Sequence, residues 1–68
     1  MNKIIINIDE FYYIKITSND DITRLYQLII RGEEDKTIVE SFSRDAFLLK
    51  VNKIVRLTNK IELLVASI

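Results

Sequence analysis

The chain of 68 residues contains no cysteine, histidine, tryptophan or proline, and it has a single glycine. Without cysteine it has neither disulfide bonds nor thiolate metal sites. Without histidine it lacks the commonest general base and the usual zinc ligand. A chain this short also has little room to shield a reactive group from water. These absences predict a protein that is not an enzyme, has no catalytic residues, and uses no metal ion or cofactor.

Hydrophobic residues make up 49% of the chain and charged residues 29%. This balance is typical of a folded globular protein. The length predicts one domain over residues 1–68. A domain of this size buries only about 60% of the surface that its unfolded chain exposes, and isoleucine is the main residue available to fill its core. We therefore expect a marginal core that self-association would help to complete.

No segment resembles a leader peptide or a membrane span. The first apolar run, Ile4 to Ile6, is shorter than the apolar core of about 7–15 residues in a secretory signal. The last apolar run, residues 61–68, is too short to cross a bilayer and contains Glu62. We therefore expect a cytoplasmic protein without membrane contacts.

Alternating, β-branched and aromatic residues predict three antiparallel strands, over residues 11–17, 23–31 and 36–43. A cluster of short polar residues predicts a turn at 18–21. Gly32 and the charged residues after it predict a tight turn at 32–35, which joins the second and third strands into a hairpin. An additional strand over residues 3–8 would make this meander four-stranded.

The turn at 32–35 pairs Arg31 with Lys36 and sets the register of the hairpin. One sheet face then collects the side chains best suited to a core: Tyr12, Ile14, Ile16, Tyr26, Leu28, Ile30 and Val39. The opposite face places Gln27 across from Glu40 and carries four large apolar side chains: Leu25, Ile29, Ile38 and Phe42. This second set is larger than isolated surface residues would explain, and it predicts a contact face in a homodimer.

From Ser43 onward the apolar period changes from two residues to that of a helix. Ser43 is suited to cap a helix whose first turn contains Asp45. Apolar residues at helical spacing then follow, namely Phe47, Val51, Ile54 and Val55 with Thr58. The pattern predicts an α+β fold in which one amphipathic C-terminal helix, ending near Asn59, packs on one face of the sheet. Residues 61–66 fit either a further strand or a longer helix.

Three consecutive carboxylates, Glu33, Glu34 and Asp35, occupy the predicted hairpin turn. In a meander, Asp9 and Glu10 lie at the same end of the sheet, so the five acids are expected to form one patch. Carboxylates bind guanidinium groups through strong bidentate hydrogen bonds, which predicts a protein partner with an arginine-rich surface. Calcium binding is a weaker alternative, because the spacing differs from an EF-hand loop. A solvated turn that keeps the protein soluble is the third.

The net charge is zero, but it is unevenly distributed. Residues 1–40 carry −3 and residues 41–68 carry +3. The basic residues of the second half fall on the outer side of the predicted helix: Lys50, Lys53, Arg56 and Lys60. No aromatic residues interleave with them, and such side chains are common on exposed helices. We therefore expect no direct contact with nucleic acid.

Residues 13–17, the turn at 18–21, residues 27–31, the acidic turn and residues 39–41 resemble, in this order, the central sheet of a family of small phage anti-CRISPR proteins. The resemblance covers residues 12–43. That family inhibits the RNA-guided DNA nuclease of type II-A CRISPR systems. Its members place an antiparallel sheet with helices against the nuclease, and acids near the strand turn mimic DNA by occupying the arginines that read the PAM guanines.

The resemblance implies that Glu33, Glu34 and Asp35 take this role in the cytoplasm of a phage-infected host cell. The protein would then be a non-enzymatic inhibitor. The alternative is a small homodimerising structural or regulatory module that uses the second sheet face.

Overall fold

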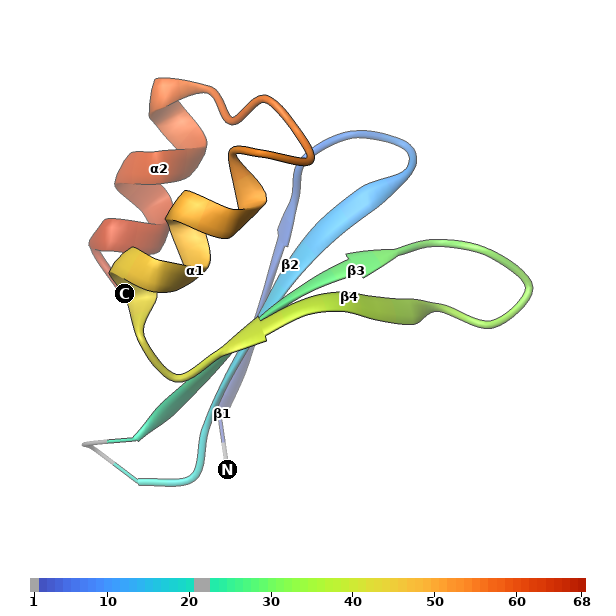
Figure 1. The fold of residues 1–68 in the computed structure, drawn as a ribbon. Coiled ribbons are helices and arrows are strands. Elements are labelled where there is room, and N and C mark those ends of the chain that lie inside the picture. The colour runs from blue at the N-terminus through green and yellow to red at the C-terminus, as the bar shows by residue number, and fades with distance from the viewer. Residues whose placement is uncertain (1, 21–22) are drawn as a thin grey trace.

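The computed structural model describes residues 2–20 and 23–68. These residues form six elements, in the order β1 (Asn2–Asn7), β2 (Tyr12–Ser18), β3 (Arg24–Ile30), β4 (Lys36–Ser41), α1 (Arg44–Val51) and α2 (Asn59–Ala66). The strands make one antiparallel sheet in the order β1-β2-β3-β4 (Figure 1). The α+β class and the antiparallel meander are therefore confirmed, with four strands. Asp21, the last residue of the predicted turn at 18–21, lies outside the described residues.

The described residues form two short helices where the sequence predicts one. Ser43 caps α1 by accepting a hydrogen bond from the backbone N–H of Ala46, and Thr58 caps α2 by accepting one from Ile61. A continuous helix over residues 44–66 would measure about 34 Å, whereas the longest extent of the molecule is 30 Å. The break lets the chain fold back over the same sheet. Asn59 therefore begins a helix instead of ending one, and residues 61–66 are helical.

Side chains join the two helices into one layer. The guanidinium Nη1 of Arg44, at the start of α1, donates a 2.9 Å hydrogen bond to the carbonyl of Ala66 at the end of α2. Asn52, just after α1, donates a 3.3 Å hydrogen bond from Nδ2 to Oε1 of Glu62. Each contact links one end of α1 to the opposite end of α2, so the helices run in opposite directions, as Figure 1 shows.

Both helices pack on the sheet face that the sequence predicts as the core. Five core residues have no exposed surface: Ile14 and Leu28 from the sheet, and Phe47, Val51 and Val65 from the helices. The ring of Phe47 lies 5.7 Å from that of Tyr26, measured between centroids.

Within the described chain, no helix is long and apolar enough to cross a membrane.

A β-bulge shifts the register of the β3–β4 hairpin. Leu28 pairs with Val39, but Ile29 pairs with Thr37, so Ile38 is the extra residue in β4. The predicted pairing of Arg31 with Lys36 is therefore wrong, because Lys36 lies opposite Ile30. Bulges increase the local twist of a strand pair, and Figure 1 shows this hairpin curving away from β1 and β2.

The second sheet face is less exposed than the sequence suggests. Gln27 lies opposite Glu40, as predicted, and donates a 3.3 Å hydrogen bond to it. Ile29 is only 4% exposed within the single chain, and Leu25 is half-buried. Of the four residues assigned to the dimer face, Ile38 and Phe42 remain exposed. The accessible part of this face is therefore smaller than its sequence implies.

The two phenylalanines of the C-terminal half provide a matched test of the core. Replacing the fully buried Phe47 with alanine leaves a cavity under α1 and should lower the free energy of unfolding by about 3–5 kcal/mol, enough to unfold much of a domain this small. Phe42→Ala, at a side chain that is 68% exposed, should change it by less than about 1 kcal/mol. Urea unfolding followed by circular dichroism measures both. Equal losses in the two variants would contradict this packing.

Candidate protein-binding site

Two loops meet at one end of the sheet: the β1–β2 turn and the β3–β4 loop. The backbone N–H of Arg31, the first residue after β3, donates a 2.8 Å hydrogen bond to the carbonyl of Phe11 in the β1–β2 turn. The five acids expected to form a patch are therefore all at this end, as the meander predicts. We call the region formed by residues 9–11 and 31–36 the acidic end.

The Arg31 side chain crosses from the hairpin to the β1–β2 turn. Its Nη1 donates to the carbonyl of Asp9 at 2.7 Å and to that of Tyr12 at 3.4 Å, and its Nη2 donates to Oδ1 of Asn7. The guanidinium carbon lies 4.8 Å from the centroid of the Tyr13 ring, which is a cation–π distance. Arg31 therefore binds carbonyls and a ring, and in the described structure it pairs with no carboxylate.

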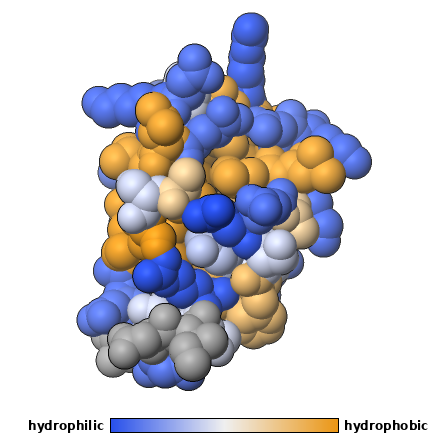
Figure 2. Space-filling model, turned by 90° about the vertical axis from the view of Figure 1, so that its left-hand side faces the viewer, coloured by the Kyte–Doolittle hydropathy of each residue, from blue (hydrophilic) through white to orange (hydrophobic). Residues whose placement is uncertain are grey.

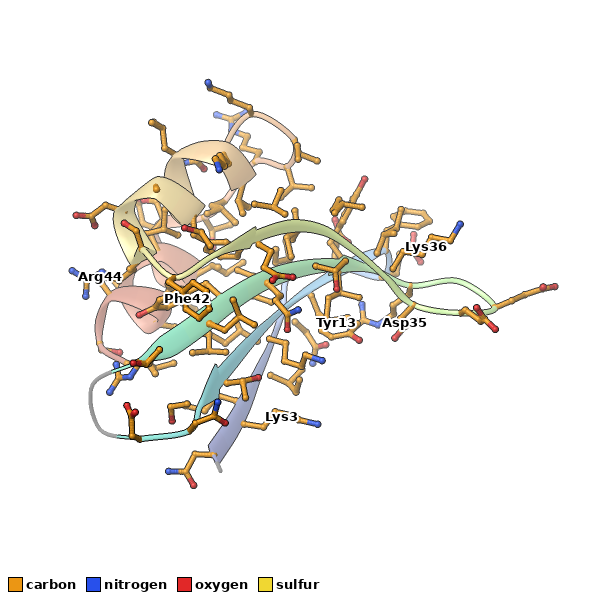
Figure 3. The ribbon with its side chains drawn as sticks, turned by 60° about the horizontal axis from the view of Figure 1, so that its bottom comes forward. Lys3, Tyr13, Asp35, Lys36, Phe42 and Arg44 are labelled. Carbon is orange, nitrogen blue, oxygen red and sulfur yellow. The ribbon has the colours of Figure 1, made fainter. Side chains whose placement is uncertain are left out.

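Asp35 shapes the loop from inside. The hydroxyl of Tyr13 donates a 2.8 Å hydrogen bond to its Oδ2, and the backbone N–H of Gly32 donates a 3.3 Å bond to its Oδ1. Figure 3 shows Tyr13 and Asp35 facing each other beneath the hairpin. Both carboxylate oxygens are thus engaged within the chain. Asp35 holds the loop to β2 and is less available to a partner than its neighbours.

Asp9 also serves the local fold. Its Oδ1 accepts hydrogen bonds from the backbone N–H groups of Phe11 at 2.7 Å and Tyr12 at 2.8 Å, which is the usual way in which aspartate closes a turn. The remaining acids, Glu10, Glu33 and Glu34, are exposed and have no hydrogen bond or ion pair with any described residue. The five predicted site residues therefore divide into two that build the acidic end and three that are free to bind.

Glu33 and Glu34 border a shallow hollow of about 690 Å³ in the hairpin end. Its other lining residues are Ile30, Arg31, Gly32 and Lys36. The only basic side chains of the acidic end are Arg31 and Lys36, against five carboxylates. In the described part of the chain, no three acidic side chains approach closely enough to hold a metal ion. The calcium interpretation therefore gains no support, and the acids are arranged as separate exposed charges.

The basic residues predicted to share one helix side belong to three different segments. Lys50 belongs to α1, Lys53 and Arg56 to the connection between the helices, and Lys60 to α2. That surface prediction was wrong because it assumed a continuous helix. Among the aromatic side chains, Tyr26 and Phe47 are buried in the core, whereas Phe11 is 57% exposed beside Glu10. Phe11 is the large apolar residue of the acidic end, and the sequence did not predict it as a site residue.

Comparisons of the chain with protein-family models, curated proteins and solved structures found no match.

The Tyr13–Asp35 contact should be visible in the titration of Tyr13. The hydrogen bond to the Asp35 carboxylate, together with desolvation, raises the pKa of Tyr13 above its ordinary value of 10.0, while Arg31 lowers it. A raised pKa means that the contact stabilises the fold fully below pH 10.0, and that its contribution is lost as Tyr13 ionises at higher pH. The loop should therefore remain attached to β2 throughout the neutral range.

Replacing Asp35 with asparagine should lower the pKa of Tyr13 because the carboxylate acceptor and its negative charge are removed. An NMR titration of the tyrosine ring signals measures this shift, and Tyr13→Phe assigns the signal. Glu33→Gln removes a charge from the same loop but no contact to Tyr13, so it should leave that pKa close to the wild-type value. A larger shift in Glu33→Gln than in Asp35→Asn would contradict the contact.

Proposed function

We propose that this protein is a non-enzymatic inhibitor that binds an arginine-rich surface of another protein through its acidic end. The observation that carries this proposal is that two exposed carboxylates without a partner are held on a loop that hydrogen bonds fix in place. Glu33 and Glu34 have no partner among the residues described, yet the loop that carries them is attached to β2 through Asp35 and to the β1–β2 turn through Arg31.

A fixed loop favours binding because less conformational entropy is lost when a partner associates. Exposed carboxylates also accelerate encounter with a basic surface, since the field of clustered charges acts before contact. Once in place, each carboxylate is able to accept two hydrogen bonds from one guanidinium group. Phe11, exposed next to Glu10 in the β1–β2 turn, adds an apolar side chain of the kind found at the centre of protein interfaces.

The proposed target is the RNA-guided nuclease of a type II-A CRISPR system, on the basis of the sequence resemblance over residues 12–43. The arginines that read PAM guanines bind electronegative atoms in the DNA major groove. Glu33 and Glu34 would offer carboxylate oxygens to the same arginines and so exclude DNA. Asp35 would act mainly through the shape of the loop, because both of its oxygens already accept hydrogen bonds.

The test separates charge from loop shape. The double variant Glu33→Gln/Glu34→Gln removes two free carboxylates and should abolish binding to the guide-loaded nuclease in a pull-down, while its thermal midpoint stays close to that of the wild type because neither side chain has a contact to lose. PAM-containing duplex DNA should compete with the wild-type protein. The matched control, Asn19→Lys/Ser67→Lys, changes the net charge by the same amount at exposed sites away from the acidic end and should still bind. Full inhibition by the double glutamine variant would exclude this function.

The alternative proposal is a homodimeric structural or regulatory module that uses the second sheet face. The exposure of Phe42 (68%) and Ile38 (42%) supports it, whereas Ile29 is already buried in the single chain and contributes little new contact area. If this face is the interface, Phe42→Ser should halve the mass in solution from twice 8.0 kDa to 8.0 kDa without unfolding the chain. Light scattering after size exclusion measures this, and an unchanged dimer in Phe42→Ser would exclude the second face.

A further inference from the structure

The free edge of β1 presents backbone groups to solvent in a defined alternation. The N–H of Ile8 donates to the carbonyl of Tyr12 at 3.1 Å, so the residue just after β1 directs its N–H toward β2. In an antiparallel pair, successive residues alternate between facing the partner and facing away. Asn2, Ile4 and Ile6 therefore bond to β2, whereas Lys3, Ile5 and Asn7 direct their N–H and C=O groups outward. Because β1 is an outer strand of the sheet, no described strand pairs with these outward groups.

This edge is also apolar. Ile4 is 38% exposed and Ile5 48%, and Lys3 is the one charged residue of the strand. Sheet edges are usually protected by several charges, a proline or a bulge, and β1 pairs with β2 in register from Asn2 to Asn7. Beside the strand, a groove of about 560 Å³ runs between β1 and α2, lined mainly by Ile4, Ile6, Ile8, Ile61, Leu64 and Ile68. Figure 2 views the helices from their outer side and shows apolar surface between the hydrophilic side chains.

The sequence of β1 is complementary to itself in one antiparallel register. With Ile5 opposite Ile5 of a second copy, Ile4 faces Ile6 and Lys3 faces Asn7. Apolar residues then meet apolar ones, the two lysines stay apart, and all outward backbone groups of Lys3, Ile5 and Asn7 find partners. A slip of one residue places the outward N–H and C=O groups of one copy opposite residues of the other copy that face their own β2, so the hydrogen bonds between the copies are lost. A slip of two residues places Ile5 against Lys3 in one direction and against Asn7 in the other, and either slip leaves an end unpaired.

We propose that two copies of this chain associate through β1 in this register, and that their sheets continue across a two-fold axis. The axis is perpendicular to the sheet, so both helix layers lie on the same side. The two α2 helices then approach each other above the junction, where Leu64, 42% exposed in the single chain, covers the groove of the other copy. The junction lies at the free edge of β1. Ile5 shares a cross-strand row with Lys15 and Gln27 of the second sheet face, and Asn7 accepts a hydrogen bond from Arg31 of the acidic end.

The size of the contact sets the expected strength of the dimer. Six residues at about 3.4 Å each make a junction about 20 Å long, and the smallest extent of the molecule is 17 Å. The flat contact is thus roughly 340 Å² on each copy, and interlocking side chains increase the accessible area that it buries. Stable complexes bury at least about 1,200 Å² in total. At roughly 680 Å² over both copies, the flat contact is smaller than this value. We therefore expect a weak dimer that is populated at about 1 mM and dissociates on dilution.

Cysteine cross-linking tests the register, and the chain has no other cysteine to interfere. In the proposed dimer the two Cα atoms of residue 5 lie about 5.5 Å apart, within the range that a disulfide spans. Those of residue 3 lie about 14 Å apart, beyond it. Under mild oxidation at high protein concentration, Ile5→Cys should therefore form a covalent dimer several-fold faster than Lys3→Cys, which is similarly exposed. Equal rates would overturn the proposal.

Analytical ultracentrifugation tests the association itself. The wild-type mass should rise from 8.0 kDa toward twice that value with concentration. Ile5→Lys, which sets two lysines against each other, should remain monomeric with an unchanged circular dichroism spectrum, and Phe42→Ser should still dimerise. A wild type that is monomeric at 1 mM, or a dimer lost in Phe42→Ser but kept in Ile5→Lys, would overturn pairing through β1. If Ile5→Lys fails to fold, the two cysteine variants decide the question.

Discussion

The burial of one sheet face beneath two short helices is the constraint on which the rest of the structure depends. The core unites Ile14 and Leu28 of the sheet with Phe47, Val51 and Val65 of the helices, all without exposed surface. Two helices of eight residues each cover one side of four strands. Because the chain has no disulfide to replace a larger core, its stability depends on this single layer. The hairpin end and the β1 edge extend beyond that layer, so Glu33, Glu34 and Ile5 stay exposed.

Arg31 connects this fold to the candidate site. It forms no ladder pair with β4, and the bulge at Ile38 brings the hairpin back into the register that pairs Leu28 with Val39. Its guanidinium group then binds the carbonyls of the β1–β2 turn and the ring of Tyr13. Had it paired with Glu33 or Glu34, the loop would be held equally well, but its negative charge would be partly neutralised. Because Arg31 binds neutral acceptors instead, the same side chain fixes the loop and leaves its carboxylates charged.

The sequence predicts most of the sheet because strands with one buried face alternate, and the alternation survives in the pairing of Gln27 with Glu40. It does not predict the bulge, since hairpin loops of four and of five residues have the same local signals here. Which loop length forms depends on hydrogen bonds from Arg31 to residues more than twenty positions away. Nor does periodicity reveal the break between the helices, because Val51, Val55, Ile61 and Val65 all fall on the buried side. Thr58, a good N-cap residue, was the one signal in the sequence that a second helix begins there.

The sequence also does not predict how the five acids of the acidic end differ in role. A count of carboxylates treats five acids as equivalent, whereas the structure gives Asp9 to the β1–β2 turn and Asp35 to Tyr13. Short side chains reach nearby backbone and hold turns, while the longer glutamates extend beyond them, so the division between building and binding acids follows side-chain length. The antiparallel two-fold proposed for β1 would place the two acidic ends at opposite ends of the joined sheet. Each would then remain open to its own partner.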